Sequence, residues 1–309
     1  MMPIRTLFAA AALGLMAATA VAQTAPNAGW TTFTEPSERA YTVEVPQGWR
    51  VAGGVKRLAP SEARPWLTAV SPDGQTEMFV GDPSVPWYST PHPEIGLREG
   101  NQSAGIHGQA MTVAAYETGA EYATRYGTRA LASVCANVQA LGTQPRPDVE
   151  DQVRPLIEYS TRLDAGMATF SCERNGQPFS AEVVAATNLF VPNPNGGVWR
   201  PAALYGFRTP QGNEAAAQQI LEHMQQSLVP DPQWRDAMKR AAEAETQAMM
   251  QQNAARLQQP PPSTYQPQPR PSPSTVVVTP RCDDLQQRRI CSINDGHLVS
   301  SGGCLVCVQ

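Results

Sequence analysis

The sequence predicts an α+β domain that is followed by a helix, a proline-rich linker and a small cysteine-rich tail. Three observations predict this organisation. Several segments between Trp30 and Pro230 alternate apolar and polar residues, which is typical of strands with one buried face. Other segments carry apolar residues at helical spacing. After residue 257 the composition changes to repeated proline, glutamine and serine, and four of the six cysteines follow.

Residues 1–22 have the three parts of a secretory signal peptide. Arg5 gives a positive start, Leu7 to Ala18 is an apolar run too short to span a bilayer, and Ala20-Val21-Ala22 is a small-x-small cleavage site. We therefore expect a periplasmic or secreted protein that begins at Gln23 and has no transmembrane segment in the mature chain. The alternative is an uncleaved membrane anchor.

The globular domain is expected over residues 30–230, a length that suits a single core. It opens with a strand over Tyr41 to Val45. Leu67 to Val70 and Glu77 to Val80 flank Ser71-Pro72-Asp73-Gly74, in which proline presets φ and glycine accepts a positive φ. This pattern predicts a β-hairpin.

The segment from Gly81 to Ala110 is rich in Pro, Gly, Ser and His and shows little periodicity. A loop of this length inside a compact domain is uncommon and is often functional or disordered.

The middle of the chain predicts a helix, a strand and a weaker helix. Thr118-Gly119-Ala120-Glu121 has the form of a capping box, and apolar residues follow at helical spacing. Val134 to Val138 alternates as a strand. A helix over Asp148 to Tyr159 would be interrupted at Pro155.

A second hairpin is expected over Met167 to Arg174 and Gln177 to Ala186, because Asn175-Gly176 favours a type I′ turn. Val198 to Phe207 is a further strand. Asn213 is expected to cap a helix with a clear apolar stripe. The stripe consists of Ala217, Ile220, Leu221, Met224 and Leu228.

Three segments follow the domain. Residues 231–257 form an exposed helix that starts with Asp231 as cap and Pro232 at its first position. Residues 258–280 are expected to be a Pro/Gln-rich disordered linker, because they carry too little apolar surface to fold. The Cys-rich tail, residues 281–309, is too short to fold on hydrophobic burial alone.

Six cysteines in an exported chain favour disulfides. Cys135 and Cys172 both fall on predicted strands, and we expect them to be joined; buried free thiols are the competing state. The tail carries the other four, and two disulfides are favoured over a zinc site with His297 or a redox C-x-x-C motif. Three pairings are open for these four residues: Cys282, Cys291, Cys304 and Cys307.

Two segments resemble the PsbP-like domain family. Tyr41-Thr42-Val43-Glu44-Val45-Pro46-Gln47-Gly48-Trp49 is similar to the opening of those domains, and Ala216 to Leu228 is similar to their closing helix. The resemblance covers roughly Trp30 to Trp234. It implies a mainly antiparallel sheet flanked by helices on both sides, and a role in binding or assembly. The family has no shared catalytic motif, so the resemblance assigns no catalytic residue.

Four residues of the Gly81 to Ala110 segment are candidates for ligand binding. Trp87 and Tyr88 are aromatic side chains in a predicted irregular loop, where they could stack on a ligand. Arg98 could pair with an anion, although a surface ion pair is the more common role. His92 could meet His107, but solvated loop histidines are favoured over a metal site. No cofactor is expected.

The net charge of −4 is mildly acidic, so the sequence lacks the excess of basic residues that is typical of proteins that bind nucleic acid. We therefore expect an exported, non-enzymatic binding or assembly module of the cell envelope, whose partner is an envelope protein or a small ligand. One alternative is an envelope hydrolase whose residues converge only in three dimensions. The other is a structural adaptor anchored through its tail. A deep pocket with convergent titratable groups favours the hydrolase, and a shallow apolar groove favours binding.

Overall fold

The computed structural model describes residues 29–105, 109–157, 160–193, 196–258, 297–301 and 304–308. Contacts divide the chain into two compact units, residues 1–252 and residues 253–309. The expected signal peptide, residues 1–22, lies outside the described residues, and so do residues 259–280 of the expected linker.

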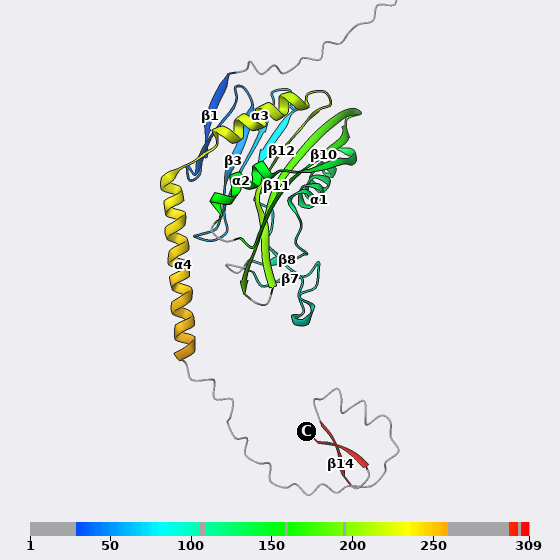
Figure 1. Cartoon of the computed structure of the whole chain (residues 1–309), viewed down its shortest axis with the longest axis vertical. Helices are drawn as coiled ribbons and strands as arrows, with labels where there is room; N and C mark the ends of the chain where they lie inside the picture. The colour runs from blue at the N-terminus through cyan, green and yellow to red at the C-terminus, as the bar shows by residue number, and fades with distance from the viewer. Residues whose placement is uncertain are drawn as a thin grey trace, which may run out of the picture. The chain divides into compact units, whose positions relative to one another are not determined.

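The first unit is a mixed α+β structure built on a curled, mainly antiparallel sheet (Figure 1). Seven of its strands form one continuous path, and each is antiparallel to its neighbours. In spatial order they are β3 (Arg50–Arg57), β4 (Ala63–Val70), β5 (Glu77–Val80), β12 (Gly196–Pro210), β11 (Gln177–Asn193), β10 (Arg162–Arg174) and β9 (Ala136–Pro145). β6 (Tyr88–Ser89) pairs with β12 and runs parallel to β8 (Met111–Val113), which also pairs with β7 (Gln102–Ser103).

Both faces of this sheet are covered, as the central strand β11 makes clear. Val183 and Ala185 belong to a core cluster that includes α1 (Gly119–Ala132). Val184 and Ala186, which alternate with them, belong to a second cluster that includes residues of α3 (Glu214–Ser227) and α2 (Pro147–Val153). Because successive side chains of a strand point to opposite faces, α1 packs on one face while α3 and α2 pack on the other (Figure 1).

A small second sheet lies on the α3 side. Its order is β1 (Trp30–Thr34), β2 (Tyr41–Pro46) and β13 (Val229–Pro230). Alternate residues of β2 are buried in the core cluster that includes residues of α3, as the sequence pattern predicts. These residues are Tyr41, Val43 and Val45. The phenolic O–H of Tyr41 donates to the Trp66 carbonyl at 2.5 Å and thereby ties this sheet to β4.

Both predicted hairpins are confirmed. β4 and β5 pair in register, from Val70 opposite Glu77 to Leu67 opposite Val80. β10 pairs with β11 over the whole length of β10, and the connecting residues, Asn175 and Gly176, both have positive φ. These are the backbone angles that a type I′ turn requires, which is why an Asn-Gly pair in the sequence locates the turn.

The predicted capping box of α1 is confirmed. The Thr118 hydroxyl accepts from the Glu121 backbone N–H at 3.3 Å, and the Glu121 carboxylate accepts from the Thr118 backbone N–H at 2.8 Å. The prediction for α3 is wrong in one detail. Asn213 occupies the cap position, but its side chain makes no capping hydrogen bond. The Glu214 carboxylate instead accepts from the Gly212 N–H.

The expected helix over 148–159 is shorter than the pattern suggested. α2 ends at Val153, and a 3-10 turn, η3 (Arg154–Leu156), continues the chain. Pro155 has no N–H to donate, so the regular helix ends before it.

The helix α4 (Pro232–Gln258) is mostly exposed. Asp231 caps it, because its carboxylate accepts from the Trp234 N–H at 2.8 Å. The Trp234 indole N–H donates to the Glu38 carboxylate at 2.7 Å, which attaches the start of the helix to the domain. No described helix is long and apolar enough to cross a membrane.

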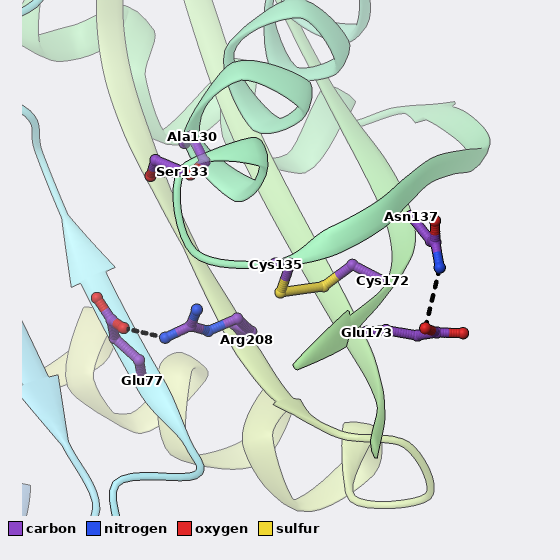
Figure 2. Close-up of a disulfide and its surroundings, with 8 residues drawn as sticks. All are labelled: Glu77, Ala130, Ser133, Cys135, Asn137, Cys172, Glu173 and Arg208. Carbon is purple, nitrogen blue, oxygen red and sulfur yellow. Dashed lines mark hydrogen bonds and ion pairs between the residues drawn. A yellow bond between two sulfur atoms is a disulfide. The ribbon is translucent and has the colours of Figure 1, made fainter. Parts of the chain in front are cut away.

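Cys135 and Cys172 form a disulfide, with Cα atoms 5.7 Å apart (Figure 2). The bond joins the connection between α1 and β9 to strand β10, and it confirms the predicted pair. Cys282 and Cys291 lie outside the described residues. Cys304 and Cys307 lie on β15 (Cys304–Val308), which pairs antiparallel with β14 (His297–Ser301); the structure describes only the backbone there.

Candidate ligand-binding site

Two hollows form where the short strand β5 ends. β5 stops at Val80, whereas its neighbours β4 and β12 both extend further. The next residue, Gly81, donates its N–H to the Leu204 carbonyl at 2.7 Å and then turns the chain away with φ of +72°. A Cβ atom at this position would lie 2.4 Å from the Pro65 carbonyl oxygen, so only glycine fits. One hollow opens on each side of Gly81 and Asp82.

The first hollow, which we call the α1 groove, has a volume of about 280 Å³. It lies between the C-terminal half of α1 and strands β4, β5, β11 and β12. Aromatic and aliphatic side chains dominate its lining. They include Trp66, Phe79, Tyr126, Ala130, Leu131 and Val134.

Arg208 lines the α1 groove and is 8% exposed. Its Nη2 atom donates to Glu77 Oε2 at 2.7 Å, while its buried Nε and Nη1 atoms have no hydrogen-bond partner among the described residues. Burial lowers the pKa of the guanidinium, and the Glu77 carboxylate opposes this effect. Figure 2 shows the Arg208 side chain reaching towards Glu77. The groove therefore combines an apolar lining with a buried cation.

A second polar contact borders the same groove. The Tyr126 phenol donates to Asp82 Oδ2 at 3.0 Å. Burial raises the pKa of Tyr126, and the Asp82 charge raises it further, so the phenol keeps its proton at neutral pH. This hydrogen bond ties α1 to the chain segment that leaves β5.

The second hollow, which we call the arginine hollow, has a volume of about 240 Å³. Two guanidinium groups line it, those of Arg64 on β4 and Arg200 on β12. Arg64 pairs with Glu62 at 3.0 Å and also donates to the Val85 carbonyl. Arg200 lies over the Trp87 ring, with its Cζ atom 4.3 Å from the ring centroid.

The two aromatic candidates from the sequence are buried. Tyr88 belongs to strand β6, which corrects the expectation that it sits in an irregular loop. Its ring stacks on Trp199, with centroids 4.2 Å apart. The Trp87 indole N–H donates to Glu62, and its ring meets Phe190 edge-on. The structure thus brings Trp87, but not Tyr88, next to a hollow.

The two polar candidates lie elsewhere. His92 forms a β-bridge with Leu97, and its buried Nδ1 atom has no partner among the described residues. The Arg98 side chain is exposed. His107 lies outside the described residues, so its expected approach to His92 is untested. A binding role for Trp87, Tyr88, His92 and Arg98 stays a prediction.

Sequence reasoning missed Arg64, Arg200 and Arg208. Arg200 and Arg208 are the only charged residues of β12, whose other residues are mostly apolar. An isolated arginine in a strand of this kind was the available signal, because charged side chains are rarely buried without a specific reason. Arg64 pairs with its near neighbour Glu62. Arg208 meets Glu77 of β5, and Arg200 meets Trp87 next to β6; both of these contacts join residues that are far apart in the sequence.

The chain was compared with known proteins. No protein-family model and no curated protein matches it. The solved structures similar to it include that of LpqN, which is involved in cell envelope biogenesis of Mycobacterium tuberculosis. That match has 10% identity, covers 66% of this chain and 91% of LpqN, and has a TM-score of 0.25. A protein of unknown function from Pseudomonas aeruginosa, a putative regulator, matches with 9% identity, 66% and 98% coverage and a TM-score of 0.24. At these TM-scores the likeness carries no information about the function of this chain.

Proposed function

We propose that this chain is an exported, non-enzymatic binding module of the cell envelope, and that its ligand occupies the α1 groove. The observation that carries the proposal is the groove itself, which has an aromatic and aliphatic lining. Concave sites lined by apolar side chains, with a few polar groups to fix orientation, are typical of binding sites. The ligand should therefore be amphipathic, with an apolar body that contacts Trp66 and Phe79.

The location is proposed from two independent features. The N-terminal sequence has the form of a signal peptide, and the body of the protein carries the Cys135–Cys172 disulfide. Disulfides form and persist mainly in oxidising compartments outside the cytoplasm. Both features support a periplasmic or secreted protein.

Membership of the PsbP-like family and the organisation of the tail are part of the same proposal. The resemblance rests on Tyr41 to Trp49 and on Ala216 to Leu228. In the structure these segments are β2 with the turn after it and α3, which contribute to one core cluster. In this proposal the linker separates a disulfide-stapled tail from the binding domain.

Binding of anilinonaphthalene sulfonate tests the groove directly, because this dye combines an apolar body with an anion. The exported protein, with its disulfides intact, should bind the dye saturably and raise its fluorescence. Trp66→Ala removes one aromatic contact, worth about 1 kcal/mol, and should weaken binding about fivefold. Trp30→Ala is the matched control, because Trp30 on β1 stacks on His223 and does not line the groove.

Equal binding by the wild-type protein, Trp66→Ala and Trp30→Ala would contradict a site in the α1 groove. Absence of saturable binding by the wild-type protein would contradict it as well. Circular dichroism of both variants must match that of the wild type, because partly unfolded proteins also bind this dye.

A further inference from the structure

We propose that the arginine hollow is a binding site for a carboxylate group, which Arg200 holds through its guanidinium. This site is distinct from the α1 groove, and the inference does not depend on the proposed function. The hollow of about 240 Å³ exists because β5 ends at Val80, while β4 and β12 continue on both sides. The segment from Gly81 to Pro86 borders the hollow without filling it.

Arg200 is the arginine of this hollow whose side chain has no hydrogen-bond partner among the described residues. Its guanidinium makes no hydrogen bond or ion pair with any residue that the structure describes; it lies over the Trp87 ring and is attracted by the Glu62 charge. Burial lowers the pKa of Arg200. Because a guanidinium keeps its proton in proteins, the result is a charged group with free N–H donors.

The Trp87 ring holds the Arg200 guanidinium in place. Glu62 accepts from the Trp87 indole N–H, and the Trp87 ring supports the guanidinium at 4.3 Å. A guanidinium that stacks on an aromatic face keeps its N–H donors free at its edge. Trp87 therefore orients Arg200 and leaves the N–H donors of the Arg200 guanidinium free.

The carboxylates around the hollow make their hydrogen bonds with groups other than Arg200. Arg64 is paired with Glu62. Asp82 also lines the hollow, but its carboxylate accepts from Ser84 and from Tyr126. Arg200 thus has no carboxylate within hydrogen-bonding contact among the described residues, although the Glu62 charge acts on it. An anion placed against its free N–H groups would gain a charge-assisted hydrogen bond in a partly buried setting.

A carboxylate is the anion that fits this geometry best. The planar guanidinium fork matches the two oxygens of a carboxylate and binds them with two parallel hydrogen bonds. The proline and aliphatic side chains of the hollow, such as Pro86, Pro201 and Leu204, suit the carbon atoms that such a ligand carries. The natural ligand would be an organic acid or an acidic side chain or chain end of a peptide.

Thermal unfolding in the presence of acetate tests this inference. A ligand that binds only the folded state raises Tm in a saturable way. At ten times its dissociation constant, acetate should raise Tm by about 4 °C relative to chloride at equal ionic strength. Arg200→Gln should abolish this rise. Arg235→Gln, an exposed arginine on α4, should keep it.

Two further measurements keep the outcomes distinguishable. Arg200→Lys retains a charge but loses the fork, and it should bind acetate at least tenfold more weakly. If Arg200→Gln fails to fold, Arg200→Lys provides the test in its place. An acetate-dependent rise that is unchanged in the Arg200 variants would overturn the inference, as would a wild-type protein with no saturable rise. A rise with inorganic phosphate but not with acetate would overturn the choice of carboxylate.

Discussion

Arg208 and Glu77 form an ion pair in which only one of the three guanidinium nitrogens is used. Nη2 donates to Glu77 Oε2 at 2.7 Å, and the buried Nε and Nη1 atoms have no partner among the described residues. An unpaired buried donor costs free energy, so we expect an asymmetric response to mutation.

Glu77→Gln should lower the free energy of unfolding by about 2 kcal/mol, because it leaves a buried cation without its counterion. Arg208→Met should change it by less than about 1 kcal/mol, because the buried donors disappear and the half-exposed Glu77 stays hydrated. Urea unfolding measures both. The control is Glu150→Gln, which removes an exposed ion pair with Arg154 and should cost at most about 0.5 kcal/mol. Equal losses in the first two variants would mean that the pair is net stabilising.

Gly81→Ala should be far more destabilising than Gly96→Ala. Both glycines have φ near +80°, so both substitutions strain the backbone by about 1 kcal/mol. The added Cβ meets the Pro65 carbonyl oxygen at Gly81 but nothing within 4 Å at Gly96. We expect a loss of about 3 kcal/mol or more at Gly81, measured by urea unfolding. Similar losses at both positions would show that the strands move apart easily.

The Cys135–Cys172 disulfide should stabilise the domain by about 3–4 kcal/mol, because it closes a loop with a sequence separation of 37. The double variant Cys135→Ser/Cys172→Ser leaves the four tail cysteines in place, so the measured loss belongs to this bond alone. Hydrogen exchange should show the largest increase in β9, the edge strand next to the bond. Unchanged stability of the double variant would contradict the prediction.

Glu35 should make stability depend on pH. It is fully buried, and burial by itself would raise its pKa. Hydrogen bonds from Ser37, Glu38 and Ala40 prevail and lower its pKa overall. A carboxylate with a lowered pKa contributes stability that is fully present above its unfolded pKa of about 4.3. This contribution is lost as the pH falls through the lower, folded value.

Glu35→Gln therefore should be less stable than the wild type at pH 7, and the difference should shrink as the pH falls below about 4.3. Denaturant unfolding from pH 7 to pH 3 provides the measurement. Glu94→Gln, on the exposed turn η1, is the control and should follow the wild type throughout. A difference that grows towards low pH would mean that the folded carboxyl has a raised pKa.

Limited proteolysis between residues 258 and 280 should release the tail, because the Pro/Gln-rich composition predicts an extended linker and such linkers are accessible to proteases. The fragment should carry two disulfides and should become protease-sensitive once it is reduced, while the body keeps its fold. Mass spectrometry under non-reducing conditions identifies the fragment and its pairing. Resistance of the linker would contradict the tether, and four free thiols or a bound zinc ion would contradict the disulfides.

The sequence by itself determined several local features of this chain. Asn175-Gly176 located one hairpin turn, and Thr118 with Glu121 located the start of α1, because these signals depend only on the φ angles and hydrogen bonds of neighbouring residues. Alternation along β2 likewise identified its buried face. The pairing of Cys135 with Cys172 was predicted because the body of the protein contains no other cysteine.

The two hollows and the side chains that line them became visible only in the tertiary structure. Arg200 and Trp87 are more than a hundred residues apart, and they meet because the short strand β6 pairs with β12. Tyr88, expected in a loop, is buried for the same reason. The α1 groove unites residues of one helix and four strands. No periodicity records such long-range contacts, because strand order and strand length are set by the packing of the whole domain.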